Sequence, residues 1–201
     1  DPHSTYIDLA AKLGKDTVIQ PNTHLLGSVN IGIKCTIGPN TTIKNSSLSE
    51  QCVVHNSVIE DSELGQRIQV GPFSHIRKGT LAEENVKIGN FAEIKNSRIG
   101  SNAKVSHFSY LGDADIDVNV NIGAGTVTCN YDGEKKSNTI IEKDSFIGSG
   151  TMLIAPVKVG RGSVTGAGSV VNKDVLPDSL VVGVPAKLIK RKKKSSKNSE
   201  V

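Results

Sequence analysis

Residues 18–43 read VIQPNTHLLGSVNIGIKCTIGPNTTI, and large aliphatic side chains recur in this stretch every six residues. They are Ile19, Leu25, Ile31, Ile37 and Ile43, and a small or β-branched residue follows each four positions later, at Thr23, Val29, Cys35, Thr41 and Ser47. A six-residue period fits neither a 3.6-residue helix nor an alternating strand. It is typical of a parallel β-helix, in which short flat strands turn at regular corners.

The same period returns further along the chain, at Leu64, Val70 and Ile76 and again at Ile147, Leu153, Val159, Thr165 and Val171. Single residues are skipped at some corners, as where Leu48 stands five residues after Ile43. Three hexads make one triangular coil, so the repeat from about Val18 to Val175 predicts roughly eight or nine coils. The period alone leaves the hand of the coil open.

The breaks in the repeat suggest boundaries. Residues 1–16 lack it and are expected to be a lead-in segment, residues 17–186 form the β-helix domain, and residues 187–201 are expected to be a basic, disordered tail. The largest internal break, TCNYDGEKKSN at residues 128–138, contains Asp-Gly and two lysines and predicts a loop that projects from the coil. Long loops on a rigid scaffold often carry function.

Composition excludes several classes of protein. Much of the net charge of +4 lies in the C-terminal tail, which has no aromatic residues for base stacking, so nucleic-acid binding is not expected. We find no signal peptide and no apolar run near 18 residues, so a membrane span is not expected. The three cysteines lack metal-site spacing and read as free thiols in a reducing cytosol, which predicts a cytoplasmic protein.

Arg77 and Lys95 are 18 residues apart, and each follows an inward residue of the repeat, Ile76 and Ile94. A regular coil would project both from one face, one rung apart. Like charges stacked this closely are unfavourable unless an anion lies between them. The pair is therefore either a phosphate or carboxylate site or two solvated surface cations.

His107 lies just downstream, with Tyr110 three residues on. A neutral imidazole is the commonest general base, although a single histidine can equally be structural or merely exposed. There is no Gly-x-Ser-x-Gly elbow, no P-loop and no converging histidines, so an acyl-serine enzyme, nucleotide chemistry and a metal site are not indicated.

Five segments carry a resemblance to a known family: GPFSHIRKG (71–79), IGNFAEIKNSRIG (88–100), SHFSYLGDADI (106–116), NIGAGTVTCNYDG (121–133) and APVKVGRGSVTGAGSVV (155–171). They resemble the hexapeptide-repeat acyltransferases. Within these they are most similar to the acetyltransferase domain of the bacterial bifunctional N-acetylglucosamine-1-phosphate uridylyltransferase/glucosamine-1-phosphate acetyltransferases. The resemblance implies a left-handed parallel β-helix that assembles as a homotrimer. It also implies that the chain is a fragment whose uridylyltransferase domain, with its magnesium, is absent.

The resemblance implies acetyl transfer from acetyl-CoA to glucosamine 1-phosphate, on the route to UDP-N-acetylglucosamine and cell-wall precursors, with no metal in this domain. It makes His107 the general base. It assigns the sugar phosphate and the sugar to Arg77, Lys95, Tyr110, Asn121 and Lys136, and it assigns acetyl-CoA to Ala124, Asn130, Tyr131, Ser149 and Ala167. These residues would come from more than one subunit.

The chain departs from the pattern of the enterobacterial enzymes at residues 183–184, where Gly183-Val184 replaces an arginine expected near the CoA. Lysines of the tail are candidates for its role. Two alternatives stay open. One is a hexapeptide acyltransferase acting on serine, another sugar or an acyl-carrier substrate, and the other is a trimerising module without catalysis.

Overall fold

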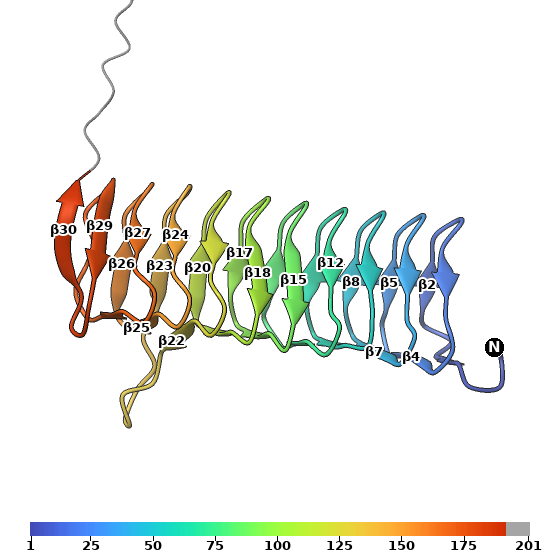
Figure 1. Cartoon of the computed structure of the whole chain (residues 1–201). Helices are drawn as coiled ribbons and strands as arrows, with labels where there is room; N and C mark the ends of the chain where they lie inside the picture. Colours follow the sequence, from blue (N-terminus) through green and yellow to red (C-terminus); the bar gives the residue numbers. More distant parts are fainter. Residues whose placement is uncertain (192–201) are drawn as a thin grey trace, which may run out of the picture.

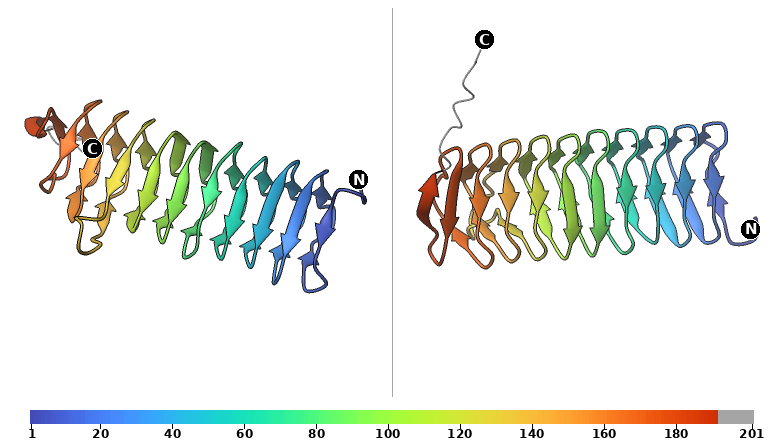
Figure 2. Two further views of the ribbon diagram at one scale, coloured as in Figure 1. Left: turned by 90° about the horizontal axis from the view of Figure 1, so that it is seen from below. Right: turned by 45° about the horizontal axis from the view of Figure 1, so that its top comes forward.

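The computed structural model describes residues 1–191, which form one long prism of short β-strands, labelled β1 to β30, and no helix. Successive strands turn from one side of the prism to the next, so that three sheets run along its length (Figures 1 and 2). No helix of these residues is long and apolar enough to cross a membrane.

Each sheet collects every third strand of the chain. Sheet A contains β1 (Tyr6–Ile7), β4 (Thr23–Leu26), β7 (Thr41–Lys44), β10 (Val58–Glu60), β13 (His75–Ile76), β16 (Glu93–Lys95), β19 (Tyr110–Gly112), β22 (Val127–Cys129), β25 (Met152–Ile154) and β28 (Val170–Val171). Sheet B contains β2 (Lys12–Leu13), β5 (Asn30–Ile31), β8 (Ser47–Leu48), β11 (Glu63–Leu64), β14 (Leu81–Ala82), β17 (Arg98–Ile99), β20 (Ala114–Ile116), β23 (Thr139–Ile141) and β26 (Val157–Val159). Sheet C contains β3 (Val18–Ile19), β6 (Thr36–Ile37), β9 (Val53–Val54), β12 (Gln69–Val70), β15 (Lys87–Asn90), β18 (Lys104–His107), β21 (Asn121–Ile122), β24 (Phe146–Ile147), β27 (Val164–Thr165), β29 (Ser179–Val182) and β30 (Lys187–Arg191).

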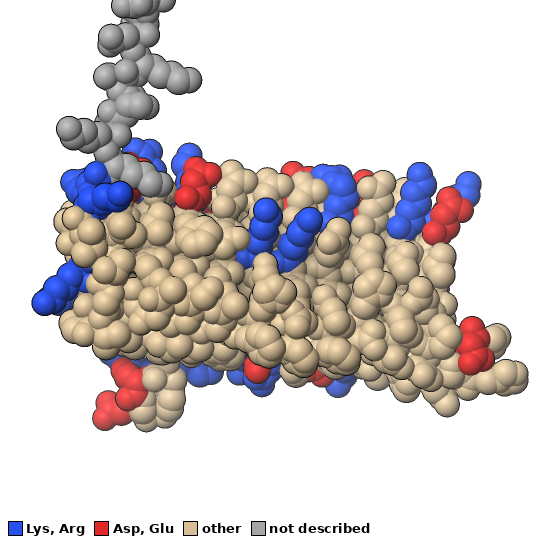
Figure 3. Space-filling view, in the orientation of Figure 1, with Lys and Arg blue, Asp and Glu red and all other residues tan. Residues whose placement is uncertain are grey.

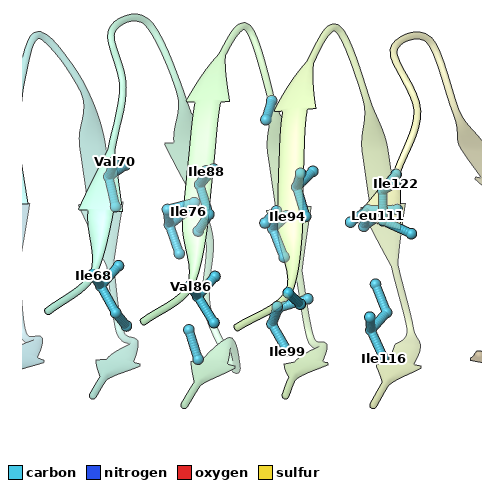
Figure 4. Close-up of a cluster of buried hydrophobic side chains, with 14 of the residues drawn as sticks. Ile68, Val70, Ile76, Val86, Ile88, Ile94, Ile99, Leu111, Ile116 and Ile122 are labelled. Carbon is cyan, nitrogen blue, oxygen red and sulfur yellow. The ribbon is translucent and has the colours of Figure 1, made fainter. Parts of the chain in front are cut away.

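The repeating aliphatic residues fill the inside of the prism, as the six-residue period predicts. Ile76, Ile94 and Leu111 are register partners in successive coils, and all three are fully buried (Figure 4). Each inward aliphatic side chain packs against the equivalent side chains of the preceding and the following coil, and this packing removes it from water. The skipped residue before Leu48 shifts the phase by one, so that Ser46, and not Ser47, is the small buried residue of that coil.

The solenoid is longer than the predicted eight or nine coils, because its sheets contain 10, 9 and 11 strands. The expected lead-in already belongs to it: β1 pairs with β4 and β2 with β5. The pattern is hard to read there because this first coil forms the end of the stack, and its inward residues Ile7 and Leu13 stay exposed.

The boundary expected at residue 187 also differs from the structure. Lys187–Arg191 form β30, which pairs antiparallel with β29. This pairing satisfies backbone groups at the edge of sheet C that another coil would otherwise cover. The remainder of the expected tail, residues 192–201, lies outside the described residues. The loop predicted at the Thr128–Asn138 break is confirmed: it leaves sheet A after β22 and projects from the prism (Figure 1).

Charged side chains of both signs lie along the edges of the prism. In the face shown by Figure 3, basic and acidic residues are interspersed rather than gathered into one basic patch. The surface also carries ion pairs, such as those of Arg98 with Glu83 and Asp115. The face in Figure 3 therefore shows no broad patch of a single charge among the described residues.

Candidate active site

Sheet A places Arg77 and Lys95 on neighbouring rungs. Ile76 is the register partner of Ile94, and the Arg77 amide donates to the Ile94 carbonyl at 2.8 Å. Each cation follows its inward isoleucine, so both side chains project from the outer face. The geometry inferred from the 18-residue spacing is therefore confirmed, while the ligand of the pair stays a prediction.

Glu93 is a member of this cluster that the sequence reasoning missed. Its carboxylate lies 2.5 Å from Nη1 of Arg77, and this hydrogen bond raises the pKa of the Arg77 guanidinium. Lys95 has no ion pair within residues 1–191. Glu93 precedes inward Ile94 as Tyr110 precedes inward Leu111, so the phase of the repeat was a usable signal for it.

Tyr110 joins the same face one rung further on. It is the register partner of Glu93, and Gly112 is the partner of Lys95. A Cβ atom at Gly112 would lie 2.5 Å from the Tyr110 hydroxyl and 2.7 Å from Nδ2 of Asn130. Any side chain at Gly112 would therefore collide with both groups. The glycine leaves room for the Tyr110 hydroxyl beside the Lys95 rung, and it places this residue, predicted to bind the sugar, near Asn130, which is predicted to contact acetyl-CoA.

His107 ends β18 at the corner between sheets C and A, and its ring is exposed. The residues predicted to contact acetyl-CoA continue the same line of the structure. Gly125 donates to the His107 carbonyl at 3.2 Å, Gly150 to that of Ala124 at 2.7 Å and Gly168 to that of Ser149 at 2.8 Å. His107, Ala124, Ser149 and Ala167 thus stand in one column, a relation that the sequence reasoning had not drawn.

The residue at the corner beside this column is phenylalanine in three successive coils up to His107 and glycine in the three coils after it. Below it, Phe73, Phe91 and Phe108 hold positive φ angles of 60°, 56° and 48°, and their rings stack with centroids 5.5 and 5.0 Å apart. Above it, the same corner position is Gly125, Gly150 and Gly168. The corner is therefore filled by aromatic rings up to His107 and left open beyond it, along the column of small side chains.

Asn130 and Tyr131 lie at the opposite edge of sheet A, where the projecting loop begins. Asn130 is buried, and its Nδ2 donates to Asp113 at 2.5 Å. Tyr131 forms an antiparallel bridge with Lys136, and the Asp132 carboxylate accepts the amides of the turn, which lowers its pKa. Lys136 thus belongs to the loop between β22 and β23, which projects from the prism (Figure 1).

Asn121 is also separate from the Arg77 cluster, because it lies on sheet C as the register partner of Lys104. One chain therefore brings together Arg77, Lys95 and Tyr110, with His107 at the adjoining corner. It leaves Asn121 on the neighbouring sheet. Residues 1–191 contain no group of three or more His, Cys, Asp or Glu that could hold a metal ion.

Comparison with known proteins defines the class. The GMPPB C-terminal domain family matches residues 2–108, more than half of the chain, and the bacterial transferase hexapeptide family (six repeats) matches residues 138–173. UDP-N-acetylglucosamine acyltransferase from Campylobacter jejuni is 18% identical with a TM-score of 0.66, over 94% of this chain and 73% of that one. LpxA of Bacteroides fragilis, at 17% identity over the same shares, has a TM-score of 0.71. The fold is the left-handed parallel β-helix of the hexapeptide-repeat acyltransferases.

Closer relatives narrow the family. Bifunctional protein GlmU from Exiguobacterium sp. is 48% identical over 182 residues, which are 90% of this chain and 40% of the relative. The GlmU proteins of Halalkalibacterium halodurans (45% identity, 90% and 40%) and Thermotoga maritima (44%, 94% and 43%) match similarly. The chain belongs to the GMPPB C-terminal domain family and is similar to the C-terminal portion of the GlmU proteins. It spans about two fifths of the length of these relatives.

Proposed function

We propose that this chain transfers the acetyl group of acetyl-CoA to the amine of glucosamine 1-phosphate, giving N-acetylglucosamine 1-phosphate and CoA. The observation that carries the proposal is the placement of Arg77, Lys95 and Tyr110 on adjacent rungs of sheet A, with His107 at the corner that leads into the Tyr110 strand. Two stacked cations, of which Lys95 has no ion pair within residues 1–191, suit a phosphate. The sequence segments that hold these residues are the ones that resemble the sugar-phosphate acetyltransferases.

The proposed reaction is a direct transfer. The sugar amine attacks the thioester carbonyl carbon, the carbon–sulfur bond breaks, and the CoA thiolate leaves. His107 takes the proton that the amine loses, which is general-base catalysis. Arg77 and Lys95 hold the phosphate, and Tyr110 and Asn121 hold the sugar, so the amine is oriented before it reacts.

The column above His107 is the proposed acetyl-CoA site. Ala124, Ser149 and Ala167 carry small side chains, and the corner beside them is glycine. An extended thioester arm fits along such a line, with its reactive end beside His107. In place of the arginine expected near residues 183–184, the chain offers Lys187, Lys190 and Arg191 of β30 as candidates for the CoA phosphates.

The remaining predicted residues support a homotrimer with shared sites. Asn130, Tyr131 and Lys136 lie at one edge of sheet A, while the His107 column lies at the other. The resemblance draws its acetyl-CoA contacts from more than one subunit, so we assign these two sets to different chains. A neighbouring subunit that supplies Asn130, Tyr131 and Lys136 through its projecting loop would complete each site, and a lone subunit should be inactive.

We further propose that the longer protein is cytoplasmic and also has a magnesium-dependent uridylyltransferase domain, since this chain spans about two fifths of its relatives. The product would then be converted to UDP-N-acetylglucosamine for cell-wall synthesis. The magnesium would belong to that domain and not to this one.

The test is thiol release from acetyl-CoA by the purified chain. Release should require glucosamine 1-phosphate and fall by about 10²–10⁴-fold in His107→Ala. Serine, other amino sugars and acyl-carrier substrates should give no comparable rate. Unchanged activity in His107→Ala would refute the base, and equal activity with glucosamine lacking phosphate would refute the phosphate site. No thiol release with any acceptor would favour a trimerising module.

A further inference from the structure

Within residues 1–191 the side chain of His107 makes one hydrogen bond, to Asn90 of the preceding coil. Nδ1 of the imidazole faces Oδ1 of the asparagine. The two residues are register partners at the ends of β15 and β18, and the Phe108 amide donates to the Asn90 carbonyl at 3.1 Å. The backbone ladder therefore fixes the spacing between the two side chains. Asparagine is also short, so it keeps little freedom to move away.

The rung above His107 offers no comparable partner. It carries Ala124, whose side chain is a methyl group and cannot take part in a hydrogen bond. The residue after His107 is Phe108, which is likewise apolar and belongs to the aromatic stack. Along the column of the proposed site, Asn90 is thus the polar neighbour of the ring that can decide which imidazole nitrogen carries the proton.

The position of this proton matters because a neutral imidazole has two tautomers, and only one of them leaves a given nitrogen free to act as a base. One ring nitrogen carries the proton and the other carries the lone pair, and the hydrogen bond made by one nitrogen decides which is which. An amide oxygen is only an acceptor, so the nitrogen that faces it must be the protonated one. Nδ1 then holds the hydrogen, and Nε2 keeps the lone pair that a general base needs.

We propose that Asn90 is a positioning residue that holds His107 in the Nδ1–H tautomer, with Nε2 ready to accept a proton. The inference rests on the proposed acetyl transfer for its purpose, although the tautomer itself can be measured without any substrate. Asn90 touches neither the sugar nor the thioester in this scheme. It acts only through the ring of His107, as the outer partners of metal-bound histidines do.

The decisive measurement is the ¹⁵N NMR spectrum of histidine-labelled protein at a pH where His107 is neutral. Signals of His107 are assigned by their loss in His107→Gln. We expect the wild-type ring to show a protonated Nδ1 and a bare Nε2. Asn90→Leu, which keeps the size but removes the acceptor, should shift the ring toward the Nε2–H tautomer. Asn90→Asp, which keeps the acceptor, should retain the wild-type pattern.

The kinetic counterpart uses the same variants. By analogy with the outer partners of metal-bound histidines, Asn90→Leu should lower kcat roughly 10–100-fold, with the KM values of both substrates little changed. Asn90→Asp should recover most of kcat. Asn30→Leu, an asparagine of β5 on sheet B away from the site, is the control and should match wild type in rate and spectrum.

Two results would overturn the proposal. One is a wild-type spectrum with the proton on Nε2, which would mean that the amide presents its nitrogen to the ring. The other is an Asn90→Leu variant that keeps both the tautomer and kcat. A wild-type protein that transfers no acetyl group would refute the proposed function instead. The tautomer shift in Asn90→Leu would then still decide whether Asn90 positions the ring.

Discussion

Arg77 reaches across one rung of sheet A to Glu93, and its Nη1 lies 2.5 Å from the carboxylate. Both side chains are about two-fifths exposed, at 39% and 40%, so the ion pair contributes little to the stability of the coil. The same guanidinium is the group proposed to hold the sugar phosphate. Glu93 therefore orients Arg77 in the structure, and it would compete with a phosphate bound at the proposed site.

Arg77→Ala should weaken the binding of glucosamine 1-phosphate while the oligomeric state and the melting temperature stay unchanged. The loss of a charge-assisted hydrogen bond costs about 1.5–3 kcal/mol, which corresponds to a KM increase of roughly 10–150-fold. Steady-state kinetics with each substrate varied would measure it, and the KM for acetyl-CoA should not move. A sedimentation change in Arg77→Ala would show that the residue is structural instead.

The Glu93 carboxylate beside Arg77 allows a second test of the proposed phosphate site. In Arg77→Ala the unpaired charge of Glu93 remains beside the phosphate, and like charges repel. Adding Glu93→Gln to Arg77→Ala should therefore recover part of the lost affinity for glucosamine 1-phosphate. A double variant that binds no better than Arg77→Ala would mean that the phosphate lies away from Glu93.

The corner glycine above His107, Gly125, allows a steric test of the proposed acetyl-CoA site. Phenylalanine is tolerated at positive φ at this corner, since Phe108 in the coil below adopts it. Gly125→Phe should thus fold, extend the aromatic stack by one ring and block the arm of acetyl-CoA, raising its KM at least tenfold. Asn56→Phe extends the stack from its other end and is the matched control. Equal KM values for the two variants would place the thioester elsewhere.

Most of the prism could be predicted from the hexads because each buried position repeats with the same chemistry. Stacked Ile76, Ile94 and Leu111 lie where the period puts them. The prediction was wrong at the two ends, where the first coil leaves Ile7 exposed and β30 pairs antiparallel outside the repeat. At an end the period no longer reports burial, since one side of the coil has no neighbour.

The candidate site could be predicted only in part, for a related reason. The phase of the repeat gives the face of a residue, which is why Arg77 and Lys95 were found. It does not give the partner of a side chain. Glu93 and Asn90 contact Arg77 and His107 through hydrogen bonds between coils, and these depend on side-chain length and direction as well as on register.

Asp113 should anchor the projecting loop. Its carboxylate accepts hydrogen bonds at 2.5 Å from the side chains of Asn96 and of Asn130, which is buried at the start of the loop. Asp113→Ala leaves the Asn130 amide without its partner, which costs about 1–3 kcal/mol. We expect faster tryptic cleavage after Lys135 or Lys136 and weaker acetyl-CoA binding. Asp61→Ala, at the equivalent corner of an earlier coil, should leave both unchanged.

Glu142 should make stability depend on pH in the acid range. Lys158 donates to its carboxylate at 2.7 Å and the Arg161 amide at 2.8 Å, and in that order these contacts lower the pKa of Glu142. A lowered pKa stabilises the fold above the unfolded value of about 4.3, and the contribution disappears as pH falls through the folded pKa. Glu142→Gln should therefore melt below wild type at pH 7, with the gap closing in acid. A gap that stays constant with pH would contradict this.

The three thiols should differ sharply in reactivity. Cys35 and Cys52 lie on adjacent rungs inside the coil, where the Cys52 amide donates to the Cys35 sulfur at 3.4 Å and both side chains are 0–1% exposed. Cys129 is only half-buried on sheet A, and burial raises the pKa of its thiol. In the native protein N-ethylmaleimide should modify Cys129 alone, slowly at pH 7 and faster as the pH rises, because the thiolate is the reacting form.

Mass spectrometry would count one adduct before unfolding and three after it, and none in native Cys129→Ser. A native adduct at Cys35 would show that the coils between β5 and β9 open on the timescale of labelling.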